Sequence, residues 1–221
     1  MKKFYYLILI LSVSILFSCQ EEQVFCCDPE INGWIKENLT DIQCMTRSEW
    51  KELPEDLKNP SFGAFTPEQK ITFWLERINA ILELDWNAEE KEHIVNLESI
   101  IIDHPHWFDI SNRTEEIEDE IAIYAFKWIK YAREELKWED KTIGSVIASG
   151  NDLLNKNGLV EMNTSGYRIE LASNSETACN CNQTYDFCSG IEDFCSDKEC
   201  REVPYCGWLL ISTCNGLCAQ S

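Results

Sequence analysis

Residues 66–82, TPEQKITFWLERINAIL, decide the fold class of this chain. The stretch opens with Thr66 and Gln69 at the spacing of a capping box, and Pro67 occupies the first helical position. Apolar residues then recur at intervals of three and four, namely Ile71, Trp74, Leu75, Ile78, Ile81 and Leu82. This period is that of an amphipathic helix. The sequence therefore predicts a helix from residue 67 to about residue 84.

Similar start and stop signals predict further helices on both sides of this one. The expected helices cover residues 28–39, 87–102, 114–136 and 140–149. Because short polar joints make consecutive helices antiparallel neighbours, we expect a small helical bundle over residues 66–150. The segment 19–65 is expected to hold an anchor and the early cysteines. Residues 151–178 are interpreted as a linker in which Leu159–Leu171 alternates like a hairpin. Residues 179–221 are predicted to form a short, disulfide-rich, irregular module, so the fold class is mainly α.

Composition and charge exclude two classes of protein. The 221 residues carry 39 acidic and 19 basic side chains, a formal net charge of −20, with no basic stripe. Such a surface repels phosphate backbones, so nucleic acid is excluded as a partner. A hydrophobic content of 44% with eight Trp supplies enough apolar surface for a core, which argues against wholesale disorder.

The first residues indicate export and lipid attachment. Lys2-Lys3 and an apolar run up to Phe17 have the layout of a signal peptide over residues 1–18. Leu16-Phe17-Ser18-Cys19 resembles a bacterial lipobox, which implies acylation of Cys19. Gln20-Glu21-Glu22 resembles the surface-export signal of lipoproteins in Bacteroidota-type bacteria. We therefore expect an outer-membrane lipoprotein at the cell surface, held to the membrane by its lipid. The alternative is a secreted protein in which Cys19 pairs with another thiol.

The cysteines are concentrated near the C-terminus. Eight of the twelve lie in the last 43 residues: Cys179, Cys181, Cys188, Cys195, Cys200, Cys206, Cys214 and Cys218. Outside the cytosol an even set of close cysteines predicts a disulfide framework without metal. Once Cys19 is lipidated, we expect Cys26 or Cys27 to bridge to Cys44. The fate of the other vicinal cysteine is left open.

No motif indicates catalysis, a metal or a cofactor. His104-Pro105-His106 gathers with Asp103 and Asp109, but the proline prevents a helical pair of imidazoles, so structural roles are favoured. The acidic run 115–120 is interpreted as complementing a helix N-terminus. The chain is accordingly predicted not to be an enzyme, with an enzyme that uses the helical body as the minor alternative.

The tail is similar to a known family. Its C-x-C-x6-C pattern over residues 179–188, the Cys206-Gly207-Trp208 triplet and the Cys214-Asn215-Gly216 triplet resemble fulvocin C and the fulvocin C-related bacterial lipoproteins. The resemblance covers about 43 residues, 179–221. It implies a bacteriocin-like module that antagonises related bacteria, with an immunity or export protein as a further partner. Release of the tail is left open.

Apolar side chains between the tail cysteines were the candidates for a binding surface. Exposed aromatic residues on a rigid scaffold favour contact with a partner, and the expected surface comprises Tyr185, Phe187, Trp208 and Leu209. The alternative is that Trp208–Ile211 forms a strand packed against the bridges. Because the tail holds six acidic residues and two basic ones, a protein or glycan receptor on a target cell is favoured over anionic lipid. A surface adhesion module without toxicity remains the competing function.

The lipobox interpretation makes the first testable prediction. Because acylation needs the thiol of Cys19, Cys19→Ala should move the protein from the membrane fraction to the soluble fraction. Immunoblots of fractionated cells would measure this change. Equal membrane partition of the two proteins would contradict lipid attachment at this position.

Overall fold

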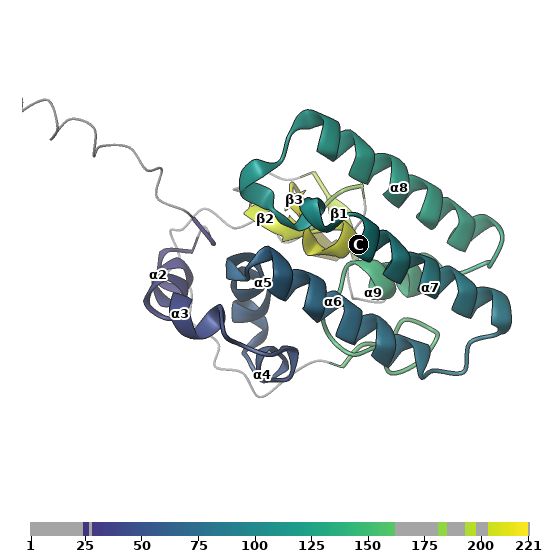
Figure 1. Cartoon of the computed structure of the whole chain (residues 1–221), viewed down its shortest axis with the longest axis horizontal. Helices are drawn as coiled ribbons and strands as arrows, with labels where there is room; N and C mark the ends of the chain where they lie inside the picture. The colour runs from purple at the N-terminus through teal and green to yellow at the C-terminus, as the bar shows by residue number, and fades with distance from the viewer. Residues whose placement is uncertain (1–23, 27, 162–180, 185–192, 198–202, 221) are drawn as a thin grey trace, which may run out of the picture.

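A helical body carries a small strand-containing C-terminal segment (Figure 1). The computed structural model describes residues 24–26, 28–161, 181–184, 193–197 and 203–220. The α-helices are α2 (Pro29–Glu37), α3 (Leu39–Ile42), α4 (Arg47–Lys51), α5 (Glu55–Ala64), α6 (Pro67–Leu82), α7 (Ala88–Asp103), α8 (Glu115–Glu134) and α9 (Asp140–Ile147). Three short 3-10 turns join them or follow them: η1 (Pro105–Phe108), η2 (Ile110–Asn112) and η3 (Trp208–Leu210). The strands are β1 (Asp193–Ser196), β2 (Val203–Cys206), β3 (Ser212–Cys214) and β4 (Leu217–Gln220). The predicted fold class, a mainly α body with a disulfide-rich tail, is confirmed.

The long helices begin where their caps predict. Thr66 and Gln69 form a reciprocal capping box at α6, and Asn87 and Glu90 form another at α7. At α8 the side chain of Thr114 accepts a hydrogen bond from the first turn. These caps satisfy backbone N–H groups that a helix start leaves without partners, so the sequence signal translates directly into geometry.

Residues 46–65 contain two helices that the sequence did not predict. A capping box of Thr46 and Glu49 starts α4, and α5 follows with Pro60 inside it. A proline in a helix interior removes a hydrogen bond and argues against a helix from sequence alone. Burial explains the outcome, because α5 buries Leu57, Phe62 and Ala64 against the rest of the body. The segment predicted as an N-terminal cysteine-containing region is therefore largely part of the helical body.

The body also extends beyond residue 150, where the sequence placed a linker. Asp152 pairs with Arg47 at 2.5 Å and with Lys51 at 2.6 Å, and Leu153 is buried. A tight turn brings Leu153 opposite Val160 in an antiparallel bridge. Residues 151–161 are thus folded onto the body, and the boundary predicted at residue 150 is wrong. The hairpin expected about residues 163–166 lies outside the described residues.

A buried arginine closes the end of α9. Arg77 is fully buried, and its guanidinium donates to the carbonyl oxygens of Ser145, Val146 (2.8 Å) and Asn151 (3.1 Å). Burial, and secondarily the charge of Arg47, lower the pKa of Arg77 to about 9. The side chain is therefore still a cation at neutral pH, where it satisfies carbonyl groups that the helix end leaves without intrahelical partners.

Helices α7 and α8 are joined by a reciprocal pair of hydrogen bonds. The His93 ring lies 3.1 Å through Nε2 from the carbonyl oxygen of Trp128, and the Trp128 indole donates to the carbonyl of His93 at 3.2 Å. The two rings stack with centroids 4.2 Å apart. Because a carbonyl only accepts, the His93 Nε2 carries the proton. Burial lowers the pKa of His93 to about 4, and the bond to Trp128 opposes this shift.

The lowered pKa of His93 predicts that the free energy of unfolding decreases on acidification at pH values above those at which carboxylates titrate. The pKa of His93 falls from an ordinary 6.5 to about 4 on folding, so the unfolded chain binds an extra proton between these values. Stability is therefore complete above pH 6.5 and is lost as the pH falls towards 4, by about 1 kcal/mol per pH unit. Urea unfolding between pH 7.5 and pH 5 would measure the slope. His93→Gln keeps a donor for Trp128 and should show a flatter slope. Equal slopes would contradict a neutral buried His93.

Candidate functional site

The C-terminal segment makes a tight turn whose backbone is unusual. Gly207 has a φ of 65°, and Leu209 and Leu210 follow with φ values of 53° and 55°. The left-handed region costs a residue with a side chain about 1 to 2 kcal/mol. Two such residues in succession need compensation from their surroundings.

The helical body supplies this compensation by enclosing the turn. Trp208, Leu209, Leu210 and Ile211 are each at most 2% exposed and belong to the same apolar core as the helices. The indole of Trp74 donates to the carbonyl oxygen of Leu209 at 2.8 Å, and Arg113 donates to the carbonyl oxygen of Ile211. The Trp128 ring meets the Trp208 ring edge-on, with centroids 5.8 Å apart. We call residues 208–211 the anchor turn.

The predicted binding surface is therefore wrong at two of its four positions. Trp208 and Leu209 have no exposed surface. The alternative of a strand packed on the bridges is also wrong, since the anchor turn is a 3-10 turn packed on helices. The tail has little core of its own, and the helical body encloses residues 208–211 instead. Tyr185 and Phe187 lie outside the described residues.

A second contact joins the tail to α5. Tyr205 of β2 is buried, and a Cβ atom added to Gly63 would lie 1.9 Å from its ring. Only glycine allows α5 and β2 to approach so closely. Burial, followed by the nearby Cys26, raises the pKa of Tyr205 above its ordinary value, so the phenol is neutral.

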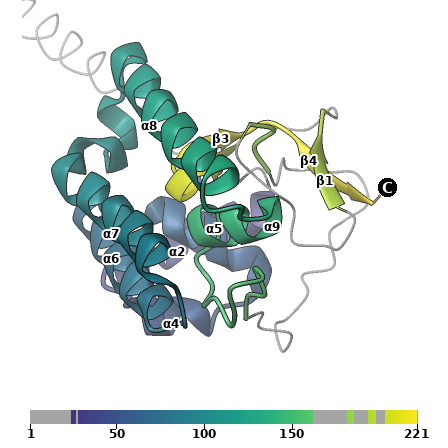
Figure 2. The same cartoon turned by 90° about the vertical axis from the view of Figure 1, so that its right-hand side faces the viewer.

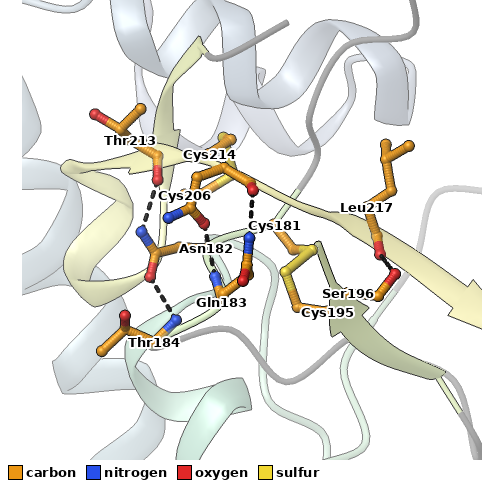
Figure 3. The surroundings of a disulfide bond; sticks show 11 residues. Cys181, Asn182, Gln183, Thr184, Cys195, Ser196, Cys206, Thr213, Cys214 and Leu217 are labelled. Carbon is orange, nitrogen blue, oxygen red and sulfur yellow. Dashed lines mark hydrogen bonds between the residues drawn. A yellow bond between two sulfur atoms is a disulfide. The ribbon is translucent and has the colours of Figure 1, made fainter. Parts of the chain in front are cut away.

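Two disulfides fix the strands on either side of the anchor turn. Cys206–Cys214 closes the β2–β3 pair around it, and Cys181–Cys195 ties the start of the tail to β1 (Figure 3). Polar contacts add to these bridges. Asn182 donates to the carbonyl of Thr213 at 2.6 Å, and the backbone N–H of Gln183 donates to the side chain of Asn215 at 2.8 Å. The residues just after Cys181 are thus held against β3 and the loop that follows it.

The expected disulfide framework is present in the described part of the tail. Cys181, Cys195, Cys206 and Cys214 form the two bridges. Cys179, Cys188 and Cys200 lie outside the described residues, as does the side chain of Cys218.

The bridge expected at Cys44 is not formed. Cys44 follows α3 and is exposed with a free thiol. Cys26 is buried and forms no bridge to Cys44. Cys27 and Cys19 lie outside the described residues.

A cleft of about 840 Å³ opens where the start of the described chain, α5, α6 and β2 meet. Its lining includes Phe25, Thr66, Lys70, Asp109 and Tyr205. Burial, and then the charge of Arg113, lower the pKa of Lys70 to about 8, with Asp109 opposing the shift. The cleft therefore places one weakly basic amine and the carboxylate of Asp109 among apolar, aromatic and polar side chains.

Comparison with protein-family models, with curated proteins and with solved structures finds no match to this chain. Among the described helices none has the length and apolar character required to cross a bilayer.

The buried anchor turn predicts that the tail and the body unfold together. Trp208→Ala should lower the free energy of unfolding by about 3 to 5 kcal/mol, the usual cost of deleting a large buried aromatic side chain. Because the two parts share one core, it should also make the tail and the helices more susceptible to protease together. Thr213→Ala, an exposed change in β3, is the matched control and should leave both unchanged. Denaturant melts and limited proteolysis would measure this, and an unchanged melt for Trp208→Ala would show that the tail is independent of the body.

Proposed function

We propose that this protein is an exported lipoprotein that recognises a receptor at the cell surface through its disulfide-framed tail, without catalysis. The observation that carries the proposal is the anchor turn, by which the helical body holds the tail in one place. The leader and Cys19 support export and lipid attachment on sequence grounds alone.

The arrangement divides the tail into an inner and an outer part. The anchor turn contacts α9, and β2 contacts α5. The antiparallel pair of β1 and β4 instead extends away from the helices (Figure 2). The Cys181–Cys195 bridge joins this outer pair to residues 181–184. We infer that the outer part contacts the receptor, while the inner part fixes the tail to the helical body.

Fixing the tail to the helical body favours receptor binding, because it lowers the free-energy cost of ordering the tail on binding. Ordering a flexible segment on binding costs free energy for each side chain and loop that is immobilised. The disulfides and the buried anchor turn order the tail when the chain folds. An outer surface of modest size can therefore bind a receptor without that cost.

Antagonism of related bacteria is the more specific form of this proposal, and the resemblance to the fulvocin C family supports it. Release of the tail would expose Trp208, Leu209, Leu210 and Ile211 to water, at a cost of about 1.5 to 3 kcal/mol for each large apolar side chain. We therefore propose that the intact chain, with its tail mounted, is the active form. Its partners are a protein or glycan receptor on a target cell and an immunity or export protein in the producer.

Binding to intact cells tests the role of the tail. The mature full chain with Cys19→Ala, labelled with a fluorophore on its amines, would be titrated onto cells of related strains. Replacing both Cys181 and Cys195 by Ser should weaken binding at least tenfold and leave the helical circular dichroism unchanged, because this bridge lies away from the anchor turn. Cys44→Ser removes an exposed thiol from the body and is the matched control.

The outcomes separate the competing functions. Binding with inhibition of growth supports antagonism, and binding without inhibition supports the adhesion module. Equal binding by the double Ser variant and the parent would contradict recognition through the outer tail. Reduction of all disulfides should abolish binding in either case.

A further inference from the structure

Two histidines and a glutamate converge where the chain passes from α7 to α8. His104 ends α7, His106 lies in η1, and Glu120 lies in the second turn of α8. His104 Nδ1 lies 3.5 Å from Glu120 Oε1, and His106 Nε2 lies 3.1 Å from Glu120 Oε2. One nitrogen from each imidazole and one carboxylate oxygen all lie within 4.8 Å of one another.

Buried neighbours hold these three side chains in place. Trp107 is fully buried, and its indole donates to Glu120 Oε2 at 2.9 Å. The His104 ring stacks on the Trp107 ring, with centroids 4.4 Å apart and planes 13° from parallel. In metal sites, residues that do not touch the metal orient its ligands through hydrogen bonds and stacking of this kind.

We propose that His104, His106 and Glu120 bind a divalent transition-metal cation of the zinc class, with water at the remaining position. Two imidazoles and one carboxylate suit zinc better than the hard cations calcium and magnesium, which prefer oxygen. Zinc binds histidine nitrogen at about 2.0 to 2.1 Å and carboxylate oxygen at about 2.0 to 2.2 Å in a tetrahedron. These lengths place neighbouring ligand atoms about 3.4 Å apart. The three atoms lie within 4.8 Å of one another, so the side chains would move closer together on binding the cation.

The sequence pattern could not reveal this set, because its third member is distant in the chain. Asp103 and Asp109 were the carboxylates considered beside the two histidines. Asp109 instead accepts hydrogen bonds from Ser111 at 2.6 Å and from Asn112 at 2.7 Å. Glu120 belongs to the acidic run 115–120, but it lies past the first helical turn and faces the histidines.

The cation would stabilise the same connection that holds the tail. Arg113 donates to the carbonyl oxygen of Trp107 at 2.5 Å and also to that of Ile211 in the anchor turn. Joining η1 to α8 through a metal would restrain Trp107, and through Arg113 it would restrain the seat of the anchor turn. Metal binding is thus expected to raise the melting temperature of the whole chain.

Calorimetric titration of the mature full chain with ZnCl₂ tests the proposal. All proteins would carry Cys44→Ser, because an exposed thiol also binds zinc. We expect one equivalent to bind and the melting temperature to rise. His106→Ala and Glu120→Gln should each weaken this binding at least tenfold. Glu116→Gln, an exposed change on the same helix, is the matched control and should bind like the parent.

Circular dichroism would show that the variants fold, and Co²⁺ in place of zinc gives a second readout. The cobalt complex should absorb weakly in the visible range, as nitrogen and oxygen ligands require, and this absorption should disappear in both ligand variants. Equal zinc affinity in parent and variants, or a cobalt spectrum with intense thiolate bands, would overturn the proposal. So would the absence of any binding at millimolar zinc.

Discussion

The hydrogen bond from the indole of Trp74 to the carbonyl oxygen of Leu209 joins the two parts of the molecule in their shared interior. Both groups are buried, so losing either partner would leave the other unsatisfied, which costs about 1 to 3 kcal/mol. The anchor turn places its two leucines, which have left-handed backbone conformations, in this interior. Trp128, Arg113 and α9 also contact the anchor turn. The positions of β2 and β3 depend on the anchor turn, because the Cys206–Cys214 bridge closes this pair of strands around it.

Local signals predicted most of the helices, and long-range packing accounts for what they missed. Thr66 and Asn87 cap helices because the groups that they satisfy lie within three residues. In α5, by contrast, Pro60 argues against a helix, and the burial of Phe62 outweighs it. Likewise nothing in the sequence near Trp208 identifies Trp74 as its neighbour, since 135 residues separate Trp74 from the carbonyl that it binds. The spacing of apolar and capping residues predicts the secondary structure of a segment, but the complete fold decides which residues an apolar segment packs against.

The same distinction applies to the candidate sites. The tail cysteines were recognisable from composition, and Cys181, Cys195, Cys206 and Cys214 are paired in two disulfides. Cys44 had the same chemistry available, yet it lies exposed with a free thiol, whereas Cys26 is buried. In the cluster of His104, His106 and Glu120, the two histidines lie in one tripeptide and the glutamate lies in the helix that follows it. Only the return of α8 past η1 brings the glutamate close to the histidines.

The distance along the chain between Trp74 and the anchor turn also bears on the order of events during synthesis. A ribosome delivers α6 long before residues 208–211, so Trp74 and Trp128 lack their contacts with the anchor turn until those residues are made. Contacts of such separation form late, because a large loop must close before they contribute. The nascent chain therefore cannot complete its core before residues 208–211 emerge.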